Sequence, residues 1–214
     1  MSAETKLRLA VYAMLIGSII LHEIAHGWAA LALGDDTAKR AGRLSLNPLV
    51  HIDPFGSVIL PGLMLLSTGF VFGWAKPVPV NIGRLRHPRN DAVLTSLAGP
   101  ATNLVLVALA GVALHLLHPQ TFWPVALLLY MGLLNLILAC FNMLPIPPLD
   151  GSALVERLLP RNWWGPYLAI RPYTLILVFG LVIIGQQSGA YLHALNGLAT
   201  SWASAAGYPG FFGP

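Results

Sequence analysis

Long apolar stretches dominate the hydropathy pattern of this sequence. A helix needs about 20 consecutive apolar residues to cross the hydrocarbon core of a bilayer. Four stretches meet this length: 8–33, 92–117, 122–144 and 168–186. Two weaker stretches, 57–72 and 191–206, are shorter, and prolines and glycines interrupt the first. The pattern predicts an all-α, multi-pass membrane protein with four transmembrane helices and one or two short, re-entrant or interfacial segments.

The amino-acid composition agrees with a membrane protein. Hydrophobic residues make up 56% of the 214 residues and charged residues 9%, whereas soluble domains carry about 25% charged residues. The net charge of +4 is scattered, which argues against a nucleic-acid surface. A single cysteine, Cys140, excludes an internal disulfide and a thiolate metal cluster. We expect one membrane domain over 1–214, without nucleic acid as a partner and with the lipid bilayer around it.

Basic residues gather in three connecting segments, 34–54, 74–91 and 145–171. Cytoplasmic loops carry an excess of Lys and Arg, so all three segments are candidates for the cytoplasmic side. If the first two both lie there, 57–72 enters and leaves the membrane on one side, and the N-terminus is external. Lys6 and Arg8 oppose this orientation, and the alternative is an internal N-terminus with 57–72 as a true span.

The first apolar stretch contains an HExxH motif, His22-Glu23-Ile24-Ala25-His26. On a helix, residues four apart share one face, so both imidazoles can reach one metal ion while Glu23 lies beside them. Zinc would lower the pKa of a bound water, and Glu23 could take its proton as general base. Ionisable residues inside a membrane span are costly and usually mark function. We therefore predict a zinc hydrolase site.

A catalytic zinc site usually has three protein ligands. No third histidine follows at metzincin spacing, because Ala32 occupies that position. Several acidic residues and one histidine stay possible: Asp35, Asp36, His51, Asp53, Asp91 and Asp150. Asp150 is favoured, because it follows three prolines that end an apolar span and precedes Gly151. The alternative for Asp150 is an ordinary polar turn.

Three motifs together resemble the site-2 protease family of intramembrane metalloproteases. They are HExxH at 22–26, AGPATN at 98–103 and NMLPIPPLDG at 142–151. The resemblance covers roughly residues 15–160 and is closest to the compact subgroup without attached regulatory domains. It implies that His22, His26 and Asp150 bind one zinc ion and that Glu23 is the general base.

The resemblance also implies roles for two asparagines, Asn103 and Asn142. In the family, such asparagines hold the substrate backbone or assist the oxyanion. Interhelical packing through amide hydrogen bonds is an equally weighted alternative. Gly99 and Pro100 are expected to shape the start of their helix.

The segment 76–81, with sequence KPVPVN, alternates and contains two prolines, which suits a small, exposed edge strand. A transmembrane substrate must unwind before hydrolysis, and pairing with an edge strand would hold it extended. A plain surface loop is the alternative.

The HExxH motif and the hydropathy predict metal-assisted hydrolysis within a membrane. The resemblance implies the substrate class, so we expect a zinc metalloendopeptidase that hydrolyses peptide bonds in or near the transmembrane segments of membrane proteins. We expect it in the bacterial cytoplasmic membrane, with the active site open to the cytoplasm. The rival function is a noncatalytic zinc-binding scaffold or a transporter. A transporter would be expected to show repeated half-helices and further intramembrane charges, and the sequence shows neither.

Overall fold

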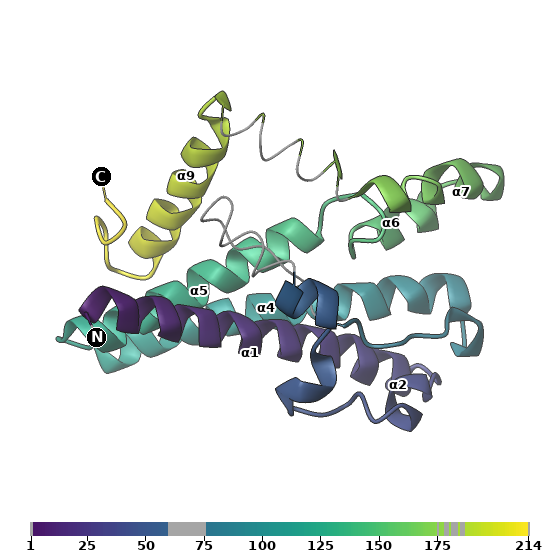
Figure 1. The fold of residues 1–214 in the computed structure, drawn as a ribbon, viewed down its shortest axis with the longest axis horizontal. Helices are drawn as coiled ribbons and strands as arrows, with labels where there is room; N and C mark the ends of the chain where they lie inside the picture. Colours follow the sequence, from purple (N-terminus) through teal and green to yellow (C-terminus); the bar gives the residue numbers. More distant parts are fainter. Residues whose placement is uncertain are drawn as a thin grey trace. The chain divides into compact units, whose positions relative to one another are not determined.

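The computed structural model describes residues 2–59, 76–174, 176, 177, 180, 184 and 187–213. All regular elements in these residues are helical (Figure 1). The α-helices are α1 (Ala3–Ala32), α2 (Thr37–Arg40), α4 (Pro88–Leu117), α5 (Phe122–Asn142), α6 (Ser152–Leu158), α7 (Arg161–Leu168) and α9 (Ala190–Ala205). Shorter turns are η1 (Pro48–His51), the π-helical η2 (Pro54–Ile59), η3 (Ile82–Arg84) and η4 (Arg171–Tyr173).

Three helices, α1, α4 and α5, are long and apolar enough to cross a membrane. They confirm three of the four predicted spans. The fourth, 168–186, lies largely outside the described residues, as does nearly all of 57–72. The weak segment 191–206 forms α9, whose 16 residues are fewer than a perpendicular span requires.

The expected β segment at 76–81 is not formed as a strand within the described chain. Its residues are extended, but they carry no ladder of hydrogen bonds to a neighbouring strand. Pro77 and Pro79 have no N–H to donate, which removes two of the six donors that a ladder could use. The segment is held by hydrogen bonds to the side chains of Glu23, Asp35 and Arg43 and to the His51 carbonyl.

The chain divides into two compact units. We call Ile16–Thr102 the motif unit, because it contains HExxH, and Met1–Leu15 with Asn103–Pro214 the terminal unit.

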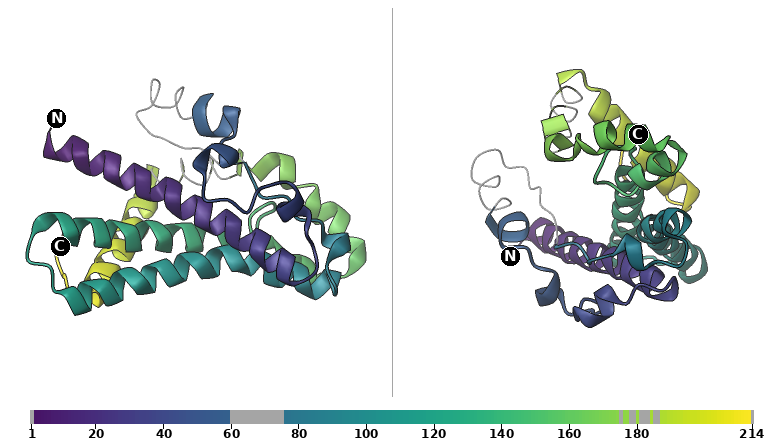
Figure 2. Two further views of the ribbon diagram at one scale, coloured as in Figure 1. Left: turned by 90° about the horizontal axis from the view of Figure 1, so that it is seen from below. Right: turned by 90° about the vertical axis from the view of Figure 1, so that its right-hand side faces the viewer.

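In the terminal unit, the second half of α4 and α5 run side by side in opposite directions (Figure 2). Helix α9 packs against α5 and closes a small core. Its buried residues are Ala110, Leu114, Val125, Leu129, Trp202, Ala203 and Ala206.

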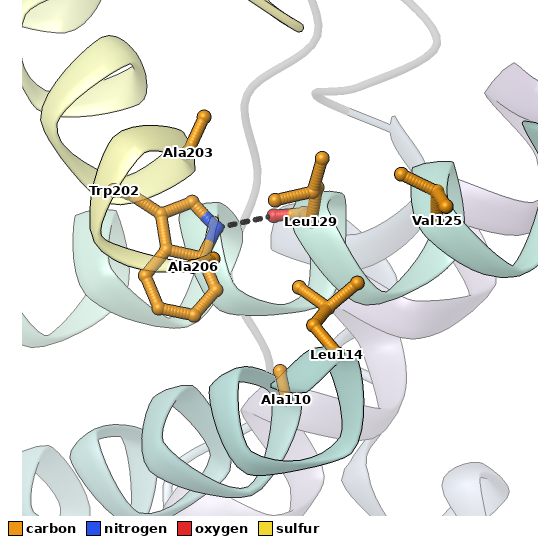
Figure 3. Packing of buried hydrophobic residues seen from close by; sticks show 7 residues of the cluster. All are labelled: Ala110, Leu114, Val125, Leu129, Trp202, Ala203 and Ala206. Carbon is orange, nitrogen blue, oxygen red and sulfur yellow. Dashed lines mark hydrogen bonds between the residues drawn. The ribbon is translucent and has the colours of Figure 1, made fainter. Parts of the chain in front are cut away.

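Trp202 joins α9 to α5 in this core (Figure 3). Its indole N–H donates to the Leu129 carbonyl over 2.9 Å, which satisfies the one polar group of a side chain that is 8% exposed. The ring lies against Gly132, where a Cβ would stand 2.0 Å from Trp202 Cζ2. Only glycine leaves room for this contact.

In the motif unit, α1 ends in a glycine-based Schellman motif. Gly34 has a φ of +109°, a conformation that glycine adopts without steric cost. Its N–H donates to the Leu31 carbonyl over 3.2 Å, and the Asp35 N–H donates to the Ala30 carbonyl over 2.8 Å. The motif turns the chain so that Asp35 is fully buried directly after the helix.

The Asp35 carboxylate then organises the next loop. Its Oδ1 accepts the Thr37 hydroxyl and the Thr37 N–H, and its Oδ2 accepts the Asn81 N–H over 2.6 Å. Burial of the carboxyl raises its pKa, but the hydrogen bonds from Thr37 and Asn81 and the nearby Arg84 guanidinium outweigh burial. The pKa of Asp35 therefore lies below its ordinary value.

Asp35→Asn should destabilise the protein by about 1–3 kcal/mol at neutral pH, the usual cost of a lost buried charged hydrogen bond. Because the folded-state pKa is lowered, the carboxylate stabilises the fold above the unfolded-state pKa of about 4. This stabilisation is lost as the pH falls through the folded-state pKa. The difference between the thermal unfolding midpoints of wild type and Asp35→Asn in detergent should therefore shrink from pH 7 to pH 3. A constant difference over that range contradicts this role.

Candidate metal centre

The two motif histidines lie one helical turn apart on α1, and both are buried. His22 is 6% and His26 is 9% exposed. Their rings meet edge to face with centroids 4.7 Å apart, and the two Nε2 atoms are 3.1 Å apart. Two nitrogens bound tetrahedrally to zinc at 2.0–2.1 Å would lie about 3.3 Å apart. The spacing fits a shared zinc ion.

Helix α4 fixes the tautomer of His26. The Nδ1 atom of His26 lies 2.7 Å from the Thr95 carbonyl oxygen. A carbonyl oxygen can only accept, so the neutral ring carries its proton on Nδ1 and leaves the Nε2 lone pair for a metal. In metal sites, a hydrogen bond from the ring nitrogen that does not bind the metal commonly orients the histidine.

Gly99 of α4 gives the two imidazoles their space. A Cβ at this position would lie 2.4 Å from His26 Nε2 and 2.6 Å from His22 Nε2. Any side chain would therefore occupy the volume in front of both ligand nitrogens. The expectation that Gly99 and Pro100 shape the start of their helix is wrong, because α4 begins at Pro88. Gly99 lies against the histidines, and its lack of a side chain leaves space in front of their Nε2 atoms.

Glu23 lies between the histidines in sequence and is half-buried. Its Oε2 accepts the backbone N–H of Val78 over 2.9 Å. On the next turn of α1, a Cβ at Gly27 would come within 2.9 Å of Val78 Cγ1. The segment 76–81 thus contacts two turns of α1. It donates a hydrogen bond to the carboxylate that the sequence predicts as the general base.

Other candidate ligands in the motif unit have structural partners. Their side chains make hydrogen bonds or ion pairs that shape local turns. The contacts are Asp35 with Thr37 and Asn81, Asp36 with Arg40 and Arg84, His51 with the Ser45 carbonyl, Asp53 with the Gly56 N–H, and Asp91 with the His87 N–H.

Asp150 belongs to the terminal unit, in the turn that follows α5. The Gly151 N–H donates to the Asn142 carbonyl over 2.8 Å, which folds the turn back onto the end of the helix. A Cβ on Gly151 would stand 2.2 Å from the Met143 carbonyl oxygen, so the turn requires glycine there. Asp150 is half-buried, and its Oδ2 is fully shielded from solvent.

Two further side chains brace the proline-rich turn. The Tyr167 hydroxyl of α7 donates to the Pro145 carbonyl over 2.9 Å, and the Thr174 hydroxyl donates to the Pro147 carbonyl. Burial and the Glu156 carboxylate raise the pKa of Tyr167, so the phenol stays protonated and able to donate. The turn that carries Asp150 is thus fixed from outside as well as within.

The two predicted asparagines differ in their surroundings. Asn103 is fully buried, and its Nδ2 donates to Asn135 Oδ1 over 2.7 Å, linking α4 to α5. Asn135 in turn donates to the Met131 carbonyl over 2.8 Å. Asn142 is half-buried, and its amide donates to the Leu138 carbonyl over 3.0 Å within its own helix. Asn103 therefore takes part in helix packing.

Comparison with known proteins identifies relatives over most of the chain. A model of peptidase family M50 matches residues 119–183. "Putative zinc metalloprotease YwhC" of Bacillus subtilis is 44% identical over 187 residues, 83% of this chain and 81% of that protein. "Putative zinc metalloprotease MJ0611" of Methanocaldococcus jannaschii is 43% identical over 80% of this chain and 75% of its own length.

A more distant relative is "Putative zinc metalloprotease Rip2" of Mycolicibacterium smegmatis. It is 34% identical over 69% of this chain and 60% of its own length. No solved structure matches the chain significantly. Because YwhC aligns at 44% identity over most of both proteins, this chain belongs to peptidase family M50, the site-2 protease family, and is a zinc metallopeptidase.

Proposed function

We propose that this zinc metallopeptidase works within the bilayer and hydrolyses peptide bonds in or near transmembrane segments of other membrane proteins. One observation carries the proposal. His22, Glu23 and His26 lie inside α1, a 30-residue apolar helix, and His22 is ten residues from its end at Ala32. At about 1.5 Å per residue this is about 15 Å along the helix. A substrate carbonyl would therefore be attacked at membrane depth.

Asp150 completes the proposed ligand set with His22 and His26. A carboxylate with two histidines is an established donor set for catalytic zinc. Support comes from the turn around Asp150, which Gly151, Tyr167 and Thr174 contacts hold in one conformation. A ligand on such a turn loses little conformational freedom on binding.

In the proposed mechanism, Glu23 moves the proton. When bound, zinc supplies a Lewis acid for the scissile carbonyl and lowers the pKa of water towards about 7. Glu23 takes a proton from the attacking water, whose oxygen adds to the carbonyl carbon. As the C–N bond breaks, Glu23 delivers this proton to the departing nitrogen. The reaction consumes one water and gives a carboxylic acid and an amine, and Glu23 ends in its starting protonation state.

Asn142 is the better candidate of the two asparagines for contact with the substrate. It is half-buried, and its amide keeps one N–H beyond its bond to Leu138. Asn103 is wholly buried with its amide bonded to Asn135, so its proposed contribution is to hold α4 and α5 in place.

The site is proposed to open to the cytoplasm, with an external N-terminus. The basic segments 34–54 and 74–91 support this orientation, because they follow α1 and precede α4. A scaffold or transporter is the competing function, and a base between two metal ligands has no use in either. Glu23 therefore discriminates between them.

Glu23→Gln should abolish proteolysis while the protein keeps its zinc, because the amide cannot take a proton but the ligands are unchanged. We expect a decrease in kcat of at least about 100-fold, the usual contribution of a general base. His26→Ala and Asp150→Ala should lose zinc and activity together. The measurements are cleavage of a reporter transmembrane helix in detergent and zinc content by elemental analysis.

A water-soluble peptide with the same cleavage sequence is the matched substrate control. Cleavage of the peptide without cleavage of the reporter helix would contradict the proposed substrate class. A Glu23→Gln variant that cleaves at the wild-type rate would favour the scaffold.

The proposed orientation can be tested with a cysteine at Ser2 in a Cys140→Ser background, so that the new thiol is the sole one. An impermeant thiol reagent should label intact cells, because the N-terminus is external. Labelling confined to lysed cells would reverse the orientation.

A further inference from the structure

Three backbone N–H groups of the extended segment 76–81 donate to other residues of the motif unit. At its start, the Lys76 N–H donates to the His51 carbonyl over 2.8 Å. In its middle, the Val78 N–H donates to Glu23 over 2.9 Å. At its end, the Asn81 N–H donates to Asp35 over 2.6 Å. The central attachment is the one that contacts the proposed general base.

Arg43 also contacts the start of the segment. Its Nη2 donates to the Lys76 carbonyl over 2.6 Å and lies 3.4 Å from the Pro77 carbonyl. The side chain is buried, with 7% of the residue exposed. Burying a guanidinium costs free energy, and the hydrogen bonds of Nη2 to the segment offset part of that cost.

The backbone of Arg43 is itself fixed. Helix α2 ends in a second Schellman motif around Gly42, whose φ is +64°. The Arg43 N–H donates to the Ala38 carbonyl and the Gly42 N–H to the Lys39 carbonyl, each over 3.0 Å. Arg43 is therefore a firm support for Lys76.

The support extends to Val78 through the backbone. Only Pro77 separates Lys76 from Val78, so a displacement of Lys76 is transmitted through two peptide bonds to the Val78 N–H. Pro77 lies between them and Pro79 follows, and each restricts φ to about −65°. The segment is thus stiff, and displacement of Lys76 would carry Val78 with it.

We propose that Arg43 is a positioning residue for Glu23 and acts through the segment 76–81. Arg43 donates a hydrogen bond to the Lys76 carbonyl, and the stiff segment from Lys76 to Val78 fixes the position of the Val78 N–H. That N–H donates to the Glu23 carboxylate and orients it. This inference rests on the proposed role of Glu23 as general base. A displaced carboxylate weakens proton transfer but leaves the ligands in place, so kcat should fall while KM and zinc content hold.

Arg43→Gln should lower kcat on the order of 10-fold, because the Glu23 carboxylate would be displaced from the position that proton transfer requires. Arg43→Lys keeps one cationic donor and should recover part of this loss. The matched control is Arg40→Gln, because Arg40 is the last residue of the short helix α2 that precedes Arg43, and its exposed side chain pairs with Asp36 at the surface. Arg40→Gln should stay within twofold of wild type.

Val78→Pro tests the last link, because it removes the N–H that Glu23 accepts and keeps an extended backbone. It should lower kcat at least as much as Arg43→Gln. Val78→Ala keeps the N–H and should lower kcat less than Val78→Pro does. If the two residues act along one route, Arg43→Gln combined with Val78→Pro should lower kcat no further than the stronger single change. A multiplicative loss, or wild-type kcat in Val78→Pro, overturns the proposal.

Amide hydrogen exchange supplies a readout that needs neither zinc nor activity. In the zinc-free protein, the Val78 amide should exchange about 10-fold faster in Arg43→Gln than in wild type, and Arg40→Gln should cause no change. Unchanged exchange in Arg43→Gln overturns the link between Arg43 and Val78. If wild type cleaves no reporter, the proposed function fails instead, and the exchange result still decides whether Arg43 positions the segment.

Discussion

The close approach of α4 to the histidine face of α1 is the contact on which the metal centre depends. Gly99 brings the α4 backbone so near that a Cβ would stand 2.4 Å from His26 Nε2. The same helix offers the Thr95 carbonyl to His26 Nδ1 over 2.7 Å. Polar groups in an apolar segment must find partners within the protein. One helix thus supplies both the space for a metal ion and the hydrogen bond that fixes a ligand's tautomer.

The rest of the motif unit arranges backbone groups around the same helix. Asp35, turned inward by Gly34, accepts an N–H from one end of the segment 76–81, and Arg43, turned inward by Gly42, donates to the other end. Between them, Val78 donates to Glu23. The turns at Gly34 and Gly42 therefore place the two side chains that fix both ends of the segment 76–81, which in turn contacts the proposed base.

The sequence predicted three apolar helices correctly, because long apolar stretches are a local signal. Helical periodicity also predicted that His22 and His26 share one face of α1, and their binding of zinc stays a prediction. It could not predict Thr95 or Val78, whose contributions come from backbone atoms that every residue type shares. Gly99 carried a signal, since a glycine beside Pro100 weakens a helix unless something requires it, but which helix it faced depends on tertiary packing. The strand expected at 76–81 does not form among the described residues, where Pro77 and Pro79 offer no N–H to a ladder. The third ligand, Asp150, stays a prediction.

X-ray absorption spectroscopy of the purified, zinc-loaded protein tests the central claim most directly. The account predicts one zinc ion per chain with two imidazole nitrogens at about 2.0–2.1 Å and carboxylate or water oxygens at about 2.0–2.2 Å. Asp150→Asn should weaken the oxygen contribution and leave the two imidazoles. A zinc ion with fewer than two imidazoles, or with a sulfur ligand at about 2.3 Å, would contradict the site built on His22 and His26.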